Sequence, residues 1–288
     1  MGARDLELFD RLCELSRARA VPFGTAVASW PAARDPDAWY TSPELVSLYG
    51  TRAGQQLSAE QLRELAFFEA VNFYSLNIYG ERFLLEGLSS RLHRRDHAAT
   101  SDYLQHFLDE ENKHLFYFAT FCRRFAGKIY PHALVAFPRE HAPGEEDFLF
   151  FAKALCFEEV VDHYNRRMAS DVRLAPVARE INRMHHLEET RHLAFGRSIV
   201  RALFVEHSPS WSIEIRARVR DGLLGFLAAT WRQYYNPEMY RDAGLADPFA
   251  LAEAAFDDEA ARAHRASVSR RCLTTLHEIG ALERKDLS

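Results

Sequence analysis

The sequence predicts an all-α protein, with a four-helix bundle core and additional helices at the N- and C-terminal ends. Three observations support this fold class. Only 13 of the 288 residues are glycine and 11 are proline, and the prolines gather in clusters. The long segments between these clusters contain few helix breakers, which is typical of helices. No segment alternates apolar and polar residues between turn signals, as a β-strand would.

The expected elements follow in chain order. A short helix covers about residues 4–19, and a proline-rich arm continues to about residue 57. The four long helices are expected near residues 58–93, 98–126, 144–169 and 174–206. A helix near 210–234 and one or two more close the chain. We expect these elements to form a single domain over residues 1–288, with the arm in 1–57, the bundle in 58–206 and the closing helices in 207–288.

Local signals support the first two long helices. Ser58, with Glu60 and Gln61 in the first turn, is a favourable start for a helix. Gly127 is expected to end the second long helix. The first long helix is apolar on nearly every side between residues 65 and 88, so we expect it to be central and buried.

Composition excludes several classes of protein. The formal net charge of −5 gives no basic field for nucleic acid. The four cysteines are far apart, which argues against a disulfide framework and favours a reducing cytoplasm. The N-terminus lacks the apolar core of a signal peptide, and no run approaches the roughly 18 apolar residues of a membrane span. We therefore expect a cytoplasmic protein that binds neither nucleic acid nor membrane.

Two of the predicted helices carry the same short motif, Glu-x-x-His. Glu111 and His114 form it on the second long helix, and Glu189 and His192 form it on the fourth. His185 lies four residues before Glu189. At about 100° per residue, His185, Glu189 and His192 fall within roughly 60° of one another on the helix surface. One copy is common by chance, but two copies on neighbouring helices indicate a shared site.

Ferritin-like bundles hold two metal ions with a Glu-x-x-His from each of two helices and one Glu from each of two others. On the first long helix Glu81 fits best, because its face is otherwise apolar, whereas Glu69 and Glu86 are rotated by over 100°. A buried Glu81 paired with an arginine is the alternative. On the third helix we prefer Glu158, whose face is drier than that of Glu159, although the choice stays open. Carboxylate and imidazole ligands suit iron or manganese.

Three further residues compete for roles near this site. Asp162, one turn after Glu158, is expected to accept the free N–H of a ligand histidine, with a plain surface aspartate as the alternative. His186 lies about 100° off the ligand stripe and is expected to pack against neighbours. Glu188 ranks second to Glu189 as a ligand, because it cannot form the i, i+3 pair with His192.

These motifs resemble those of the p-aminobenzoate N-oxygenase (AurF-type) family of non-haem di-iron oxygenases. The resemblance covers about residues 58–240, and its carriers are the segments Asn77 to Arg82, Asp109 to His114, Phe157 to Asp162 and His185 to His192. The third histidine is its specific mark, since common ferritin-like sites use only two. The resemblance implies seven metal ligands: Glu81, Glu111, His114, Glu158, His185, Glu189 and His192.

The resemblance also implies a function. We expect a monooxygenase with two iron ions that uses O₂ to oxidise the nitrogen of an arylamine-type substrate, giving a hydroxylamine or nitro product. The chain has no G-x-G-x-x-G motif and no P-loop, so electrons should come from a separate reductase or ferredoxin. A homodimer is expected. The substrate pocket should lie beside the metals, and its candidate lining residues are Phe73, Tyr74, Ile78 and Phe151, although core packing is the stronger explanation for these four.

Two other functional classes fit the same motifs. One is a di-iron hydroxylase or desaturase that acts on carbon, because metal ligands do not specify the substrate. The other is a non-catalytic iron-binding protein of the ferritin type. Such storage proteins are usually shorter and lack a third histidine, so we expect the enzyme.

Overall fold

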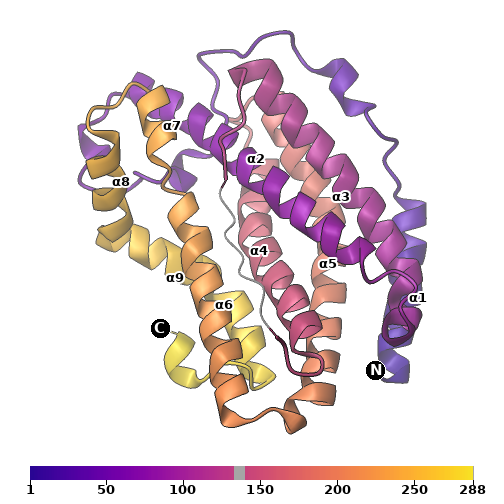
Figure 1. The fold of residues 1–288 in the computed structure, drawn as a ribbon. Helices are drawn as coiled ribbons and strands as arrows, with labels where there is room; N and C mark the ends of the chain where they lie inside the picture. The colour runs from indigo at the N-terminus through magenta and orange to yellow at the C-terminus, as the bar shows by residue number, and fades with distance from the viewer. Residues whose placement is uncertain (133–139, 288) are drawn as a thin grey trace.

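The computed structural model describes residues 1–132 and 140–287. Its centre is a bundle of four long helices, shown in Figure 1: α2 (Ala59–Ser89), α3 (Ser101–Phe121), α4 (Glu145–Ser170) and α5 (Pro176–His207). Helix α2 packs most extensively on α3, and α4 on α5. The described residues contain no β-strand, only one isolated bridge between Trp39 and Leu174. The predicted all-α bundle is confirmed.

Helix α2 forms where the sequence signals place it. The Ser58 hydroxyl accepts a hydrogen bond from the backbone N–H of Gln61 at 3.1 Å, and the Gln61 side chain accepts one from the Ser58 N–H at 2.9 Å. This reciprocal pair satisfies two of the N–H groups that a helix start leaves free. Most of α2 between residues 65 and 88 is buried, as its apolar character predicts.

The ends of α2 and α3 differ from the expected bounds. Helix α2 ends at Ser89, four residues early, because the chain turns back through His93, whose φ is 57°. The last turn of the second helix is not α-helical but a π turn over Cys122–Ala126. Gly127 follows it with a φ of 65°, the left-handed conformation in which glycine ends a helix.

Two glycines allow α2 to lie close to α4. A Cβ atom on Gly80 would overlap the ring of Phe157, and a Cβ atom on Gly87 would overlap the ring of Phe150. Gly87 follows Gly80 by seven residues on α2, whereas its neighbour Phe150 precedes Phe157 by seven residues on α4. The two helices are therefore antiparallel. Side chains at equivalent heights on the two helices, including Glu81 and Glu158, are brought face to face by this close packing.

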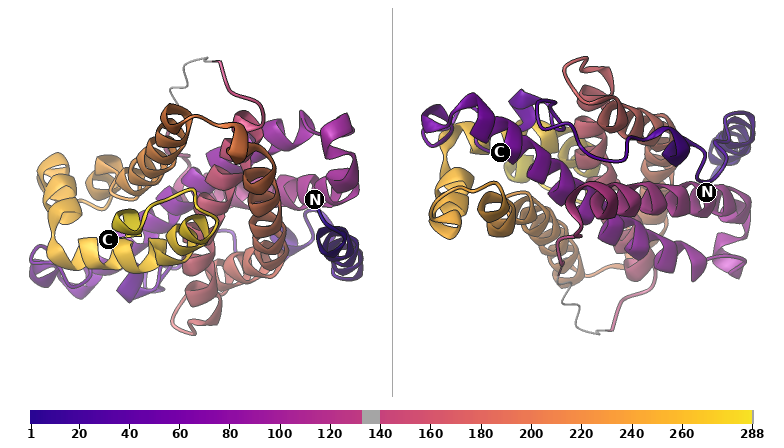
Figure 2. Two further views of the ribbon diagram at one scale, coloured as in Figure 1. Left: turned by 90° about the horizontal axis from the view of Figure 1, so that it is seen from below. Right: turned by 90° about the horizontal axis from the view of Figure 1, so that it is seen from above.

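Shorter helices cover the outer sides of the bundle (Figure 2). The N-terminal helix α1 (Ala3–Ala18) packs on α3 and α5. On the opposite side, α6 (Ile213–Gln233) and α9 (Glu259–Glu278) pack on α4. Between these two helices in the chain come α7 (Pro237–Asp242), which packs on α2, and α8 (Pro248–Asp257), which packs on α7 and α9. Three helices rather than one or two therefore follow α6, because each of these prolines begins a helix instead of breaking one. Among the described helices, none has the length and apolar character needed to cross a bilayer.

Candidate metal centre

Seven buried side chains meet inside the bundle, and they are the seven residues that the sequence motifs single out. They form two adjoining groups, in each of which one nitrogen or oxygen of every residue lies within 4.8 Å of the others. The groups are Glu81, His114 and His185 in the first, and Glu111, Glu158, Glu189 and His192 in the second. None of the seven is more than 3% exposed. Each of α2, α3, α4 and α5 contributes at least one.

Two carboxylates lie between the groups. Oε2 of Glu111 is 3.0 Å from Nδ1 of His114, and its Oε1 is 2.9 Å from Nδ1 of His192. Oε1 of Glu189 is 2.7 Å from Nε2 of His185 and 3.3 Å from Nδ1 of His192. Each carboxylate therefore reaches a histidine of both groups, which is the position of a carboxylate shared by two ions.

Five polar atoms of this centre lack the hydrogen-bond partners that buried groups normally find. Atoms without a hydrogen bond include one oxygen each of Glu81, Glu111, Glu158 and Glu189, and Nε2 of His185. His185 Nε2 lies close to Glu189 but is not aligned for a hydrogen bond. Lone pairs that converge without a shared proton fit a metal ion between them. The residues therefore fit a pair of metal ions.

The charges of the four buried carboxylates also fit a pair of metal ions. Burial, together with the charge of Glu111, raises the pKa of Glu81 well above its usual range. Burial and the charge of Glu189 do the same to the pKa of Glu158. Four carboxylates in so dry a space are costly without compensating cations. Two divalent ions would balance the four charges, and a carboxylate and imidazole donor set suits iron and manganese.

Glu158 and Glu159 occupy different surroundings. Glu158 faces the second group, whereas Glu159 pairs with Arg197 and lies 3.5 Å from Arg271. Glu81 has no arginine partner among the described residues; its nearest cation-forming neighbour is His185, at 3.6 Å. These positions favour Glu158 over Glu159 and disfavour the arginine-paired alternative for Glu81.

A second pair of carboxylates holds the outer nitrogens of two histidines. Nε2 of His192, on α5, lies 2.8 Å from Glu110 of α3, and Nε2 of His114, on α3, lies 2.8 Å from Glu188 of α5. Each Glu-x-x-His is thus preceded by a glutamate that crosses to the opposite helix. A carboxylate on the outer nitrogen fixes the ring orientation and directs the other nitrogen toward the site. The sequence motifs predict Glu188 only as a second choice to Glu189 as a ligand, and they do not identify Glu110.

Buried cations keep these two carboxylates charged. Arg191 lies 2.6 Å from Glu110, and Lys113 lies 3.2 Å from Glu188. Burial raises the pKa of Glu110, but His192 and Arg191 outweigh it and bring the pKa to about 2. The doubled glutamates and the cations beside them, in Glu110-Glu111-x-Lys113 and Glu188-Glu189-x-Arg191, are the sequence signal that identifies this arrangement.

The expected role of Asp162 is wrong. Its Oδ1 lies 2.5 Å from Nδ1 of His186, which belongs to neither group, and it contacts no ligand candidate by a hydrogen bond. Asn165, about one helical turn further along α4, contacts His185 instead: its amide nitrogen lies 2.8 Å from Nδ1 of the ring. If the amide is turned over, its oxygen accepts the Nδ1–H, which leaves the lone pair of Nε2 directed inward.

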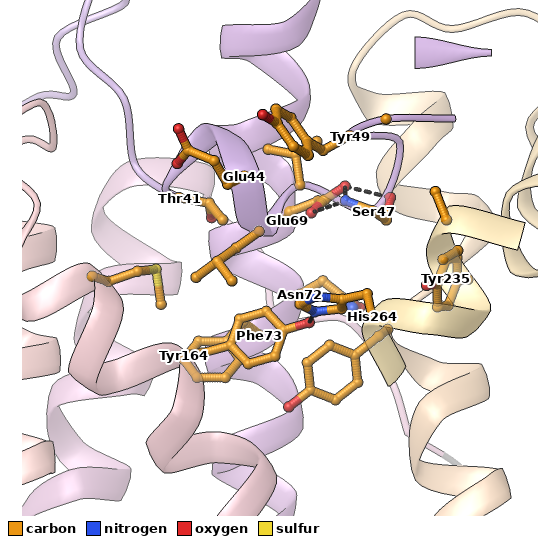
Figure 3. A pocket seen from close by; sticks show the side chains of 17 residues that line it. Thr41, Glu44, Ser47, Tyr49, Glu69, Asn72, Phe73, Tyr164, Tyr235 and His264 are labelled. Carbon is orange, nitrogen blue, oxygen red and sulfur yellow. Dashed lines mark hydrogen bonds between the residues drawn. The ribbon is translucent and has the colours of Figure 1, made fainter. Parts of the chain in front are cut away.

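Only one of the four expected pocket residues lines a described cavity. Phe73 borders a cavity of about 320 Å³ between α2, α4, α9 and the N-terminal arm (Figure 3). Tyr74 instead stacks on Phe118 and accepts a hydrogen bond from Asn182. Phe151 is buried in the hydrophobic core, and Ile78 is half-buried and packs against that core. For these three residues the core-packing explanation holds.

Comparisons with known proteins identify the family of this chain. No curated protein matches the chain at a significant level. Among solved structures, a tyrosine-to-phenylalanine mutant of an R2-like ligand-binding oxidase, with an anaerobically reconstituted Mn/Fe cofactor, has a TM-score of 0.40 and 13% identity, covering 91% of this chain and 92% of that chain. The family described as p-aminobenzoate N-oxygenase AurF matches residues 4–280. The match spans nearly the whole sequence, and the chain therefore belongs to the AurF family and is a non-haem di-iron oxygenase.

Proposed function

We propose that this oxygenase attacks the nitrogen of an amine, of arylamine type, and yields a hydroxylamine or a more oxidised nitro product. The observation that carries the proposal is the match of residues 4–280 to a family of N-oxygenases. In the first step the amine, O₂, two electrons and two protons give the hydroxylamine and water. The electrons come from a separate reductase or ferredoxin, because the sequence has no flavin or nicotinamide motif.

We assign the seven clustered residues as the iron ligands. The support is their burial, their convergence in two groups and the unpaired oxygen atoms among them. Two bound iron ions supply the redox chemistry that activates O₂. The chain itself contributes a dry site, carboxylates that neutralise the ions, and histidines held by Glu110, Glu188 and Asn165. A dry site also protects a reactive oxidant from side reactions with water.

Two further features belong to the proposal. We place the enzyme in the cytoplasm, in keeping with four buried cysteines that are all free. A homodimer is the commonest assembly for soluble enzymes and is the state we expect. We also treat the bundle and its flanking helices as one functional domain.

One experiment tests the metal centre and the reaction by separate measurements. The protein is reconstituted with ferrous iron without O₂, and bound iron is counted. It is then exposed to O₂ and a reductant with anilines of varied para substituents and with matched compounds that carry methyl in place of the amine. We expect two irons per chain and oxidised nitrogen products. Fewer than one bound iron per chain would contradict the proposed metal centre. Oxidation of the methyl compounds alone would contradict N-oxygenation and indicate an oxygenase that attacks carbon.

A further inference from the structure

The cavity beside Phe73 contains a buried acid that no cation neutralises. Glu69 is 8% exposed and lines this cavity. Its carboxylate accepts hydrogen bonds from the backbone N–H of Ser47 at 2.9 and 3.0 Å and from the Ser47 hydroxyl at 2.5 Å. Among the described residues, no lysine, arginine or histidine lies within ion-pair distance of Glu69. Figure 3 shows the Glu69 carboxylate beside Ser47 in the cavity wall.

The other lining residues supply mainly aromatic surface. No lysine or arginine is among the described residues that line the cavity. The lining histidine, His264, lies 3.1 Å from the Tyr164 hydroxyl, and burial lowers its pKa, which favours the neutral ring. The other lining acid among the described residues, Glu44, is already paired with Arg173, at 2.7 and 2.9 Å. The phenylalanine and tyrosine rings in the wall are Tyr49, Phe73, Tyr164, Tyr234 and Tyr235. Aromatic faces around one carboxylate are the surroundings that stabilise an organic ammonium ion, whereas a carboxylate ligand would find no partner.

The cavity has an exposed and a buried side. Tyr49, 54% exposed, lines it on the exposed side, whereas Phe73 and Tyr164 are buried and stack on each other at 5.5 Å. Glu69 lies twelve residues before Glu81 on α2, a distance of about 18 Å along the helix. Glu69 is therefore remote from the metal centre.

One polar atom in the cavity wall has no partner. The hydroxyl of Tyr234, a residue 9% exposed, has no hydrogen bond among the described residues. This unpaired hydroxyl indicates a site whose polar groups are incomplete without a ligand. Burial raises the pKa of Glu69 to about 8, although hydrogen bonds from Ser47 act to lower it, and a cation bound beside Glu69 would favour its charged form.

From this geometry we propose that the cavity binds a protonated organic amine, with its ammonium group at Glu69 and its carbon skeleton between the tyrosine rings. None of the seven candidate metal ligands lines the cavity, so this binding site is separate from the metal centre. The proposal therefore does not depend on the proposed reaction.

Calorimetric titration of the iron-loaded protein at constant pH tests the proposal without turnover. The probes are phenethylamine, phenethyl alcohol and hydrocinnamate, which share one skeleton and end in a cation, a neutral group and an anion. We expect phenethylamine to bind at least tenfold more tightly than either of the others. Equal affinity for the amine and the alcohol, or tighter binding of hydrocinnamate, would overturn the proposal, and this comparison needs no mutant.

Variants then locate the site. Glu69→Gln keeps an acceptor for Ser47 and should lower the affinity for phenethylamine at least tenfold while leaving phenethyl alcohol unchanged. Glu44→Gln is the matched control, since Arg173 already occupies that carboxylate, and should change the amine affinity less than twofold. An unchanged affinity in Glu69→Gln would overturn the assignment. Loss of aniline oxidation with intact, Glu69-dependent amine binding would instead refute only the proposed reaction.

Discussion

His114 and His192 each turn Nδ1 toward the metal centre and Nε2 toward a carboxylate on the opposite helix. His185 is reversed, with Nε2 inward and Nδ1 at Asn165. A partner on one ring nitrogen decides which nitrogen carries the proton, and so which one offers its lone pair to a metal. At the scale of single residues, the partners of each histidine thus indicate which of its nitrogens would bind a metal.

Replacing the third histidine tests its role as a ligand. His185→Ala should lower bound iron from two to about one per chain and reduce turnover by at least 100-fold, because the first group would keep only Glu81 and His114. Metal analysis and product assays measure the two effects. His186→Ala is the matched control: its neighbour is Asp162, outside both groups, and it should keep both irons. Full iron content and full turnover in His185→Ala would contradict the assignment.

At the scale of helices, the glycines of α2 set how closely it approaches α4. Gly87→Ala would force the Phe150 ring to move, and we expect it to lower the free energy of unfolding by about 1–3 kcal/mol. Gly80→Ala displaces Phe157, next to Glu158, and should also reduce iron binding. Urea unfolding and metal analysis measure these effects. Gly222→Ala on α6, where an added Cβ meets nothing, should leave stability equal or higher. A similar loss in all three variants would contradict the packing argument.

An ion cluster fastens the end of α2 and the following turn to the start of α4. Asp147 lies 2.7 Å from Arg91, 3.2 Å from Arg94 and 3.1 Å from His97. Burial raises the pKa of Asp147, but these three partners outweigh it and bring the pKa down to about 2. An acid with a lowered pKa adds stability above its unfolded pKa of about 4, and this contribution is lost as the pH falls from about 4 to about 2.

Removing this acid should therefore change both stability and its pH dependence. Asp147→Asn is expected to lower the free energy of unfolding by about 2 kcal/mol at pH 7 and to flatten its decline between pH 4 and pH 2. Urea titrations at both ends of that range measure the change. Asp10→Asn, at an exposed position of α1, serves as the control. An unchanged acid profile in Asp147→Asn would show that the cluster does not hold the two helices together.

At the scale of the whole molecule, the seven proposed ligands come from all four bundle helices, so removal of the metal ions should loosen the fold. Ligands that bind only the folded state stabilise it, by about 2.7 kcal/mol for a site filled at 100 times its dissociation constant. For a chain of this size, we expect chelation to lower the melting temperature by about 5–10 °C, and added iron to restore it. Calorimetry of matched samples measures the shift. Equal melting temperatures would mean that the seven residues do not hold ions across the bundle.

Helical periodicity made much of this protein predictable from sequence. Glu111 and His114, or His185, Glu189 and His192, share a face because of their spacing alone, and breakers such as Gly127 mark where helices end. The buried environment of Glu81 follows from the apolar residues around it. These features depend on neighbours within one turn or two, and the sequence contains that information directly.

The remaining features depend on how separate helices are rotated and aligned. Asp162 and Asn165 both lie within two turns of Glu158, but only the angle between α4 and α5 brings Asn165 rather than Asp162 to His185. Glu110 of α3 contacts a histidine of α5, and Glu188 of α5 contacts a histidine of α3. Glu69 of α2 likewise accepts hydrogen bonds from Ser47 of the N-terminal arm. All these contacts join residues that are distant in the chain. The sequence by itself determined which residues are suited to bind metal; only the tertiary packing decided which partners orient them, because that choice is made across helices and not along one.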